Sequence, residues 1–508
     1  MIKKRVRYAV RMFLFALIVA FLWREVENIL VKPKDVGWYS DGFTNIYKEK
    51  DYYDILISGT SIAIANTNAE EFYLQYGIAA TTIGEPSQST CISYYSVEEA
   101  LNYQSPKAIL FDVRSLFYTK DRICDLIRKD EHYYVHLVLD DMKNLKTRYR
   151  AFRAIKEDFY PKISFWDYFS NMYYTHVYWE NIVEENFTHE LPPDRMDGSR
   201  MLLGITPKQR KAEIYDIDND GEKAIIPACN MKYLIKMIEL CKKKDTDLIL
   251  VCGSGLYDWN WKEYNAVYEI AKKYDLAYLD INLHEKEIGM DWETDVSDGV
   301  HLNLSGSVKW TDYLGNYLKN NYDIPDRRKD PRYDDYKENE ERFRQMTKAM
   351  EVKKEFESAD DFKQYMNSLL ELDKEGYAIF MAVSDDASYK LGPKRLKDLR
   401  KLGITKSLKD KFRYSFLAVI DDGEVVIQKL SKAKVSAVAA LNNGKKYQLY
   451  SGGKLSGERA SLIIDESEWM RNGRGINIVI YDKEADEVLS SVYFDTVGEP
   501  NPAPRKKA

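Results

Sequence analysis

The sequence predicts an α/β protein whose main domain holds a parallel sheet covered by helices on both faces. Short apolar runs with the length of buried strands occupy residues 54–59, 108–113, 247–253 and 276–280. Segments with the apolar spacing of helices lie before and after the third of these runs, at residues 231–243 and 261–274. Apolar strands that alternate with amphipathic helices are typical of a parallel sheet buried on both sides.

Length and charge narrow the class of protein. The 508 residues allow two to four domains at roughly 100–200 residues per domain. Hydrophobic residues make up 45% of the chain, which is enough for buried cores and excludes global disorder. The chain has 75 basic and 81 acidic residues and a formal charge of -6, so it lacks the basic excess of a nucleic-acid-binding protein. We expect no nucleic-acid partner.

The cysteines and histidines give no sign of a metal site. None of the five cysteines forms a C-x-x-C pair, and their number is odd. Apart from His301, the histidines fall in no metal-ligand spacing. We therefore expect no metal and no cofactor, and the cysteine pattern does not decide the compartment.

The N-terminus has the features of a membrane anchor. Basic residues at positions 3–11 precede an apolar run over residues 12–23, an arrangement that keeps the N-terminus in the cytoplasm. The run is shorter than the ~20 residues of a membrane span and would also suit the core of a signal peptide. Residues 24–28 lack a small-x-small cleavage site. We expect a single-pass, uncleaved signal anchor over residues 1–30, with the rest of the chain outside the cytoplasm. A cleaved signal peptide is the alternative, and a buried soluble helix is the third interpretation.

Composition divides the chain after the anchor. The α/β domain is expected over residues 31–322, with an aromatic-rich insertion over residues 115–230. We interpret the insertion as a helical cap packed by Tyr and Trp side chains; the alternative is that some of these rings stack on carbohydrate. Residues 323–361 are densely charged and are expected to form a solvated linker helix.

The pattern changes after residue 361. Residues 362–498 contain short alternating strands, for example at 378–383 and 476–481, which Gly-containing turns separate. This pattern predicts a second domain of α+β or mostly β structure. Residues 499–508 form a polar tail.

A serine follows the first predicted strand, in the sequence Ser58-Gly59-Thr60-Ser61. Ligands of open α/β sheets bind at the carboxyl ends of the strands, so this turn places Ser61 well for a nucleophile. If Ser61 also begins a helix, the free backbone N–H groups there favour a developing oxyanion. Gly-x-Ser turns are common, and the alternative is that Ser61 only caps a helix.

A second motif lies far downstream, between Ser297 and Asn303. His301 can act as the general base that takes the Ser61 proton. Asp298, three residues earlier, can orient the imidazole and stabilise its charged form. Each motif is weak alone. Together, the strand-Gly-x-Ser block and the Asp-x-x-His block predict a Ser–His–Asp catalytic site.

This combination resembles the SGNH/GDSL hydrolase superfamily over about residues 50–322. The first block of that superfamily is Gly-Asp-Ser or Gly-Ser-Ser. The last is Asp-x-x-His, often followed by Leu-Asn and a Gly, and here it extends from Asp298 to Gly306. The chain looks most like the membrane-anchored branch of DltD-like and alginate-acetylation-like proteins, which act on extracellular polymers. The resemblance implies an SGNH-type three-layer fold and a catalytic set of Ser61, Asp298 and His301.

The resemblance also implies donors for an oxyanion, from the nucleophile's backbone and from a Gly and an Asn in later blocks. The backbone N–H groups of Ser61 and Gly84 fit the first two donors. The Asn has no obvious counterpart, and Gln88 or Thr82 are candidate substitutes. Loss of one donor costs about 100-fold or more in rate, so an impaired site stays an alternative.

Two positions beside Ser61 depart from the superfamily pattern. Thr60 replaces the usual Asp or Ser, and Ile62 replaces a frequent His, but neither change removes the nucleophile. Thr60 is also a candidate substrate contact, together with His176 and Trp179 of the insertion, whose segment resembles one in anchored relatives. The alternative is that His176 is a packed histidine of the cap.

A second resemblance covers about residues 362–498. The Gly-Arg-Gly-Ile-Asn element at residues 473–477 and the Phe-Asp-Thr element at residues 494–496 look like the interleukin-like EMT inducer (ILEI/PANDER) domain. That domain is also the carbohydrate-binding stem of a protein O-mannose N-acetylglucosaminyltransferase. The candidate sugar-binding residues are Asp385, Asp386, Arg413 and Arg474. Asp and Arg suit sugar hydroxyls because their hydrogen bonds are charge-assisted. The alternative is that the two Asp residues cap the following helix and that Arg474 pairs with an acid.

These features predict an extracytoplasmic serine esterase or O-acyltransferase of the bacterial cell envelope. The acyl group that it removes or transfers is expected to be an acetyl group. The acceptor or donor of this group is expected to be a cell-envelope or extracellular polysaccharide. Its expected partners are the membrane, a glycan and an integral-membrane acyltransferase. The alternative is a catalytically impaired SGNH protein that binds glycan or acts as a scaffold in an acyl-transfer complex.

Overall fold

The computed structural model describes residues 2–30, 42–128, 133–165, 168, 179, 182, 185–188, 195–206, 221–253 and 259–497. The chain divides into two compact units, Met1–Glu341 and Arg342–Ala508.

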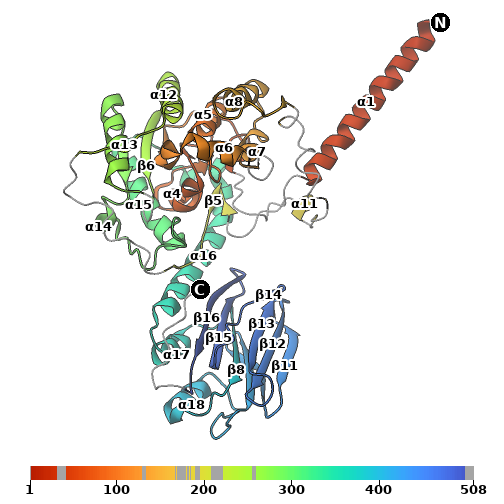
Figure 1. Cartoon of the computed structure of the whole chain (residues 1–508), viewed down its shortest axis with the longest axis vertical. Coiled ribbons are helices and arrows are strands. Elements are labelled where there is room, and N and C mark those ends of the chain that lie inside the picture. The colour runs from red at the N-terminus through yellow and green to blue at the C-terminus, as the bar shows by residue number, and fades with distance from the viewer. Residues whose placement is uncertain are drawn as a thin grey trace. The chain divides into compact units, whose positions relative to one another are not determined.

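The described part of the first unit contains a five-stranded sheet of order β2-β1-β3-β6-β7. Figure 1 labels β6, one of its strands. Every neighbouring pair of strands is parallel, so the predicted parallel sheet is confirmed. The strands are β1 (Ile55–Ser58), β2 (Ala80–Thr82), β3 (Ala108–Asp112), β6 (Asp247–Cys252) and β7 (Tyr278–Asp280). The sequence pattern did not predict β2, a three-residue strand that pairs with β1 at the edge of the sheet.

Both faces of this sheet are buried. Alternate side chains of a strand point to opposite faces, and in β1 Ile55 and Ile57 enter one hydrophobic cluster while Leu56 enters the other. The Leu56 cluster includes side chains of α5 (Thr90–Ala100), α12 (Ala228–Lys243) and α13 (Trp261–Tyr274). The opposite cluster includes side chains of α3 (Ser61–Asn66), α4 (Ala69–Tyr76) and α15 (Leu304–Asn321). Burial on both sides explains why the strands are continuous apolar runs.

Helix α1 (Ile2–Leu30) is apolar, and its side chains from Lys4 to Val26 are exposed. Its stretch Lys4–Val26 is long and apolar enough to cross a membrane, a property that a signal sequence shares. The end of the helix contacts a short element of the insertion, α11 (Glu185–Thr188), where Asn186 Nδ2 donates to the carbonyl of Ile29 over 2.8 Å. A long apolar helix with an exposed surface suggests association with a membrane.

The described part of the insertion is built from helices and one small hairpin. Its elements are α6 (Lys120–Arg128), α7 (Tyr133–Leu139), α8 (Leu145–Asp158), α11 and the hairpin of β4 (Arg195–Met196) with β5 (Ser199–Arg200). Tyr168 is fully buried, with its ring centroid 4.7 Å from that of Phe152 and 5.4 Å from that of His136. These rings pack against protein, as the cap interpretation requires.

The start of the charged segment packs on the first unit. The segment contains η4 (Arg327–Lys329), η5 (Pro331–Tyr333) and α16 (Asp334–Ser358). The Tyr336 hydroxyl accepts a hydrogen bond from the Ala80 N–H (3.1 Å) and donates one to the Ala80 carbonyl (2.6 Å). Its ring also stacks on Tyr73, with centroids 4.3 Å apart. The first turn of α16 therefore covers the outer edge of β2, which differs from the solvated linker that the charge density predicted.

The second unit contains a mixed sheet, drawn in blue in Figure 1. Its central strand β8 pairs antiparallel with β9 and β15 and, over two residues, parallel with β12. The strands are β8 (Tyr377–Asp385), β9 (Ser415–Asp421), β10 (Glu424–Ser431), β11 (Val435–Ala440), β12 (Lys446–Gly453), β13 (Arg459–Ile464), β14 (Ser467–Glu468), β15 (Gly475–Asp482) and β16 (Glu487–Phe494). With α17 (Phe362–Glu371) and α18 (Gly392–Lys401), this is a separate folded unit of α+β structure, as predicted.

Candidate functional site

Ser61, His301 and Asp298 lie in one hydrogen-bonded chain. The Ser61 Oγ is 2.8 Å from His301 Nε2, and His301 Nδ1 is 2.8 Å from Asp298 Oδ2. When Nδ1–H donates to the carboxylate, Nε2 is left as the acceptor for the Ser61 proton. The structure thus brings together, over 240 positions of sequence, the three residues that the two motifs predicted.

The turn after β1 aims Ser61 at the carboxyl edge of the sheet. Gly59 has a φ of +151°, and a Cβ there would lie 2.6 Å from the Asp112 Cβ, so only glycine fits without a shift. Thr60 then caps α3, because its hydroxyl accepts the N–H of Ile62. Ser61 is therefore the first residue of a helix, and Thr60, not Ser61, is its cap.

A tight loop holds His301 and Asp298. The Ser297 N–H donates to the His301 carbonyl (2.9 Å), which closes the loop. Within it, Asp298 Oδ1 accepts the N–H groups of Val300 (2.7 Å) and His301 (2.8 Å). Asn303 then caps α15 through its side-chain oxygen, so a helix begins immediately after the loop.

The Asp298 carboxylate stays ionised over a wide pH range. Partial burial by itself would raise its pKa, but the hydrogen bonds from the His301 ring and from the two backbone N–H groups outweigh burial and lower the pKa to about 2. The Asp298 side chain is 48% exposed and the His301 side chain 12%. An ionised carboxylate at Nδ1 fixes the tautomer and the orientation of His301.

Thr60 supports the turn and does not face an open cleft. Its side chain is buried, and its hydroxyl donates to Asp112 Oδ2 over 3.0 Å while accepting from Ile62. The single hydroxyl proton is therefore committed to Asp112. This geometry leaves Thr60 no donor for the substrate contact that the resemblance implied.

The candidate oxyanion donors have different surroundings. The Ile83 N–H donates to Ile57 and the Glu85 N–H to Gly59, so the chain continues beyond β2 alongside β1 and places Gly84 next to Gly59. Gln88 is buried, and its Nε2 donates to the Ser93 hydroxyl over 2.9 Å. The amide of Gln88 thus supports the start of α5.

Asn66 is a functional candidate that the sequence patterns missed. It is the last residue of α3, and its fully buried amide accepts the Leu302 N–H (2.9 Å) and donates to the Gly253 carbonyl (2.9 Å). An Asn five residues after Ser61 has no signal in a single sequence, because its partners lie 187 and 236 positions away.

The insertion also supports the His301 loop. The Thr206 N–H donates to the Val296 carbonyl (3.0 Å), and Asn303 Nδ2 donates to the Gly204 carbonyl (3.0 Å). The Leu304 N–H donates to the Leu202 carbonyl (2.7 Å). The segment before Thr206 therefore lies along the loop, a role that aromatic content alone did not predict.

The structure does not test the remaining candidates of the insertion. His176 lies outside the described residues. Trp179 is 63% exposed. Its role as a substrate contact stays a prediction.

The candidate sugar-binding residues of the second unit divide into buried and exposed groups. Asp386 is buried and accepts the N–H groups of Ser388 (2.8 Å), Tyr389 (3.1 Å) and Arg413. These contacts hold two loops together, so Asp386 has a structural role. It does not cap the following helix α18, whose N-cap is Leu391, so the capping alternative was wrong in that detail.

Arg474 has an exposed side chain that forms a forked ion pair with Asp495. This matches the alternative in which Arg474 pairs with an acid, although exposure leaves its outer surface open to a ligand. The Asp385 carbonyl accepts the Lys454 N–H (2.8 Å), and the Arg413 guanidinium lies 4.7 Å from the centre of the exposed Phe412 ring. Arg413, Asp385 and Arg474 therefore remain available for the predicted sugar contact.

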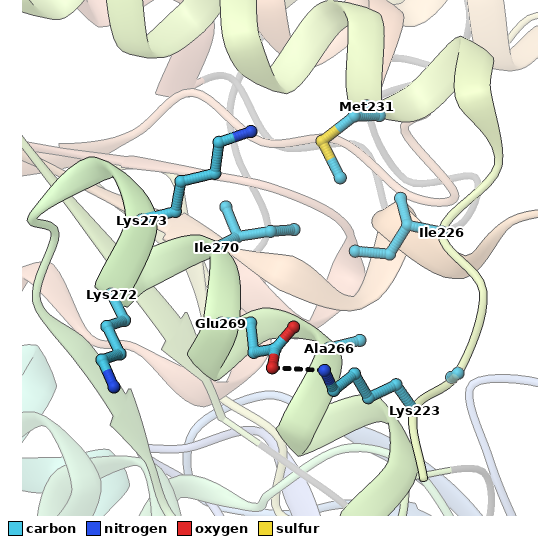
Figure 2. Close-up of a pocket in the computed structure, with 9 residues that line it drawn as sticks. Lys223, Ile226, Met231, Ala266, Glu269, Ile270, Lys272 and Lys273 are labelled. Atoms are coloured by element: carbon cyan, nitrogen blue, oxygen red, sulfur yellow. Dashed lines mark ion pairs between the residues drawn. The ribbon is translucent and has the colours of Figure 1, made fainter. Parts of the chain in front are cut away.

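A cavity of about 640 Å³ lies elsewhere in the first unit, between α12 and α13 (Figure 2). Its floor is apolar, with Ile226, Met231 and Ile270, and an ion pair between Lys223 and Glu269 lies at its side. None of the three residues of the hydrogen-bonded chain lines it. Among the described residues, no three His, Cys, Asp or Glu side chains are grouped so as to hold a metal ion.

Comparisons with known proteins add no identity. No protein-family model matches the chain, and no curated protein matches it. The chemistry of the site is therefore argued from its own geometry.

Proposed function

We propose that this chain is an SGNH-type serine esterase or O-acyltransferase with Ser61 as nucleophile, His301 as general base and Asp298 as the residue that orients His301. The observation that supports this most is the pair of 2.8 Å contacts, from Ser61 Oγ to His301 Nε2 and from His301 Nδ1 to Asp298 Oδ2. A nucleophile within hydrogen-bond reach of a base that a third group orients is the arrangement of covalent acyl transfer.

In the proposed first step, Ser61 Oγ attacks the carbonyl carbon of an ester and its proton passes to His301 Nε2. The tetrahedral intermediate collapses, the C–O bond to the alcohol breaks, and the alcohol leaves with the proton from His301. In the second step, water or a sugar hydroxyl attacks the acyl-enzyme and gives its proton to His301. The C–O bond to Ser61 then breaks, and His301 returns the proton to Ser61 Oγ. Water makes the chain an esterase, and a sugar hydroxyl makes it a transferase.

The oxyanion would lie at the start of α3. The Ser61 N–H is one proposed donor, because the first N–H groups of a helix have no partner within the helix. The Gly84 N–H is the second, supported by the position of Gly84 beside Gly59. Donors of this kind act on the charge that develops in the transition state and contribute about 100-fold each.

The substrate class is proposed from the resemblance and from helix α1. An apolar N-terminal helix suits a protein held at the envelope by a membrane, with its α/β unit outside the cytoplasm. We propose that the acyl group is acetyl and that it is carried by a cell-envelope or extracellular polysaccharide. An ILEI-like second unit would hold the glycan through Asp385, Arg413 and Arg474, and an integral-membrane acyltransferase would supply the acyl group in a transferase.

A second candidate function is a non-catalytic glycan-binding or scaffold protein with an SGNH fold. One observation favours it: the Gln88 amide, which could have replaced the missing oxyanion Asn, is engaged with Ser93. The intact contacts of Ser61, His301 and Asp298 favour the enzyme instead.

A fluorophosphonate probe separates the two functions. The full chain in detergent, treated with the probe alongside Ser61→Ala, is expected to be labelled covalently only when Ser61 is present. Labelling of both proteins would place the reactive serine elsewhere. A folded parent chain that takes no label would reject the enzyme and favour the glycan-binding protein.

A further inference from the structure

We propose that Asn66 is the positioning residue that holds the His301 loop against the helix of the nucleophile. The inference rests on the proposed function, since it assigns a role within the same site. The observation behind it is one amide on the last residue of the nucleophile's helix. This amide contacts both the residue after His301 and the residue after strand β6.

The amide of Asn66 is used in two directions. Its Oδ1 accepts the N–H of Leu302, the residue after His301, over 2.9 Å. Its Nδ2 donates to the carbonyl of Gly253, the residue after β6, over 2.9 Å. The side chain is fully buried, so no water can replace either contact without opening the core.

Asn66 and Ser61 are the two ends of one rigid piece. Helix α3 has six residues, so about 7.5 Å of helix separates its ends at about 1.5 Å per residue. The hydrogen bond to Leu302 at one end and the contact with His301 Nε2 at the other therefore fix the loop at two points. The loop's internal bonds, such as Ser297 N–H to the His301 carbonyl, set its shape but not its distance from α3.

Only an amide satisfies both partners. An Asp at position 66 would still accept the Leu302 N–H, but its carboxylate would face the Gly253 carbonyl without a proton to donate. A Leu of similar volume would leave both backbone groups buried without a partner. The Leu variant loses the bond that holds the His301 loop to the end of α3, although the contacts of the loop with residues 202–206 remain. A displacement of about 1 Å at a catalytic group costs about 100-fold in rate.

The test compares Asn66→Leu and Asn66→Asp with Asn230→Leu in the full chain. Asn230 is a matched control, because it is equally buried and donates to the carbonyls of Leu116 (2.9 Å) and Tyr118 (2.8 Å), which belong neither to α3 nor to the His301 loop. The readouts are the rate of fluorophosphonate labelling and the kcat and KM for p-nitrophenyl acetate. Circular dichroism and melting temperature show which variants are folded.

We expect Asn66→Leu to lower kcat and the labelling rate by about 100-fold, with KM changed by less than about threefold. Asn66→Asp, which keeps the Leu302 contact, is expected to lose less and serves if the Leu variant does not fold. Asn230→Leu is expected to lower the melting temperature comparably but to keep kcat within about threefold.

Folded Asn66 variants that react at the parent's rate would overturn the inference while the proposed function stands, and so would an equal loss of kcat in Asn230→Leu. A parent chain that takes no label would overturn the proposed function, and the inference would fall with it.

Discussion

The hydroxyl of Thr60 donates a hydrogen bond to the buried carboxylate of Asp112, with 3.0 Å between the two oxygens. Thr60 precedes the proposed nucleophile, and Asp112 is the last residue of the neighbouring strand β3. The same hydroxyl caps α3 by accepting the Ile62 N–H. The contact therefore fixes the nucleophile's turn to the sheet and leaves an ionisable group in the interior.

Asp112→Asn is expected to stabilise the first unit above about pH 6. Burial raises the pKa of Asp112 from 3.8 to about 6, although its hydrogen bonds and the Arg114 charge oppose this. Since the folded chain binds this proton more tightly, rising pH between about 4 and 6 costs the parent about 3 kcal/mol of stability. The Asn variant keeps an acceptor for Thr60 and avoids that loss. Its melting temperature relative to the parent should rise by about 5 °C from pH 4 to pH 7; a difference independent of pH would contradict the prediction.

Asp298→Asn is expected to lower the rate of fluorophosphonate labelling by roughly two to four orders of magnitude without unfolding the chain. The neutral amide cannot stabilise the protonated His301 and favours the wrong tautomer. Because the hydrogen bonds overcome burial and hold the pKa of Asp298 near 2, its contribution to stability is present above about pH 4 and is lost only as pH falls toward 2. The parent's pH–rate profile should therefore show no limb from Asp298 above about pH 4, and such a limb would reject the assigned role.

The candidate triad was predictable because its signals are local. Ser61 stands three residues after an apolar strand, and Asp298 and His301 share a four-residue motif. Their catalytic role stays a prediction, but their contacts show that the two motifs meet in space. Asn66 and Thr206 were not predictable, since each acts through backbone groups on distant segments that leave no residue-type pattern.

The sheet was predictable where burial makes strands apolar. Strand β2, Ala80–Thr82, carries only three residues and no large apolar side chain, so periodicity could not reveal it. The packing of Tyr336 was equally hidden, because its segment is dominated by charge. The buried Tyr336 ring, whose hydroxyl makes two hydrogen bonds to Ala80, holds this segment on the first unit although most of its residues are charged.

Tyr336→Phe is expected to destabilise the first unit by about 1–3 kcal/mol, because it leaves the N–H and carbonyl of Ala80 without their hydroxyl partner. Tyr73→Phe is the matched control. The Tyr73 ring stacks on Tyr336, but its buried hydroxyl has no hydrogen-bond partner among the described residues. Its removal should be neutral or slightly stabilising. Urea unfolding monitored by tyrosine and tryptophan fluorescence measures both changes, and equal effects in the two variants would show that the hydroxyl bonds of Tyr336 contribute nothing.

Arg474→Ala and Asp386→Asn separate sugar binding from structure in the second unit. Arg474 has an exposed ion pair with Asp495, and exposed pairs contribute only about 0–1 kcal/mol to stability. If the proposed glycan contact is real, Arg474→Ala should lower binding on a glycan array by about tenfold or more and leave the melting temperature unchanged.

Asp386→Asn should lower the melting temperature first, because an amide nitrogen replaces an oxygen that accepts the buried loop contacts from Ser388 and Arg413. Glycan binding should fall only as the unit unfolds. Unchanged glycan binding in Arg474→Ala would remove that residue from the proposed site. If Arg474→Ala lost glycan binding together with its melting transition, the loss would report unfolding of the unit and not a contact of Arg474.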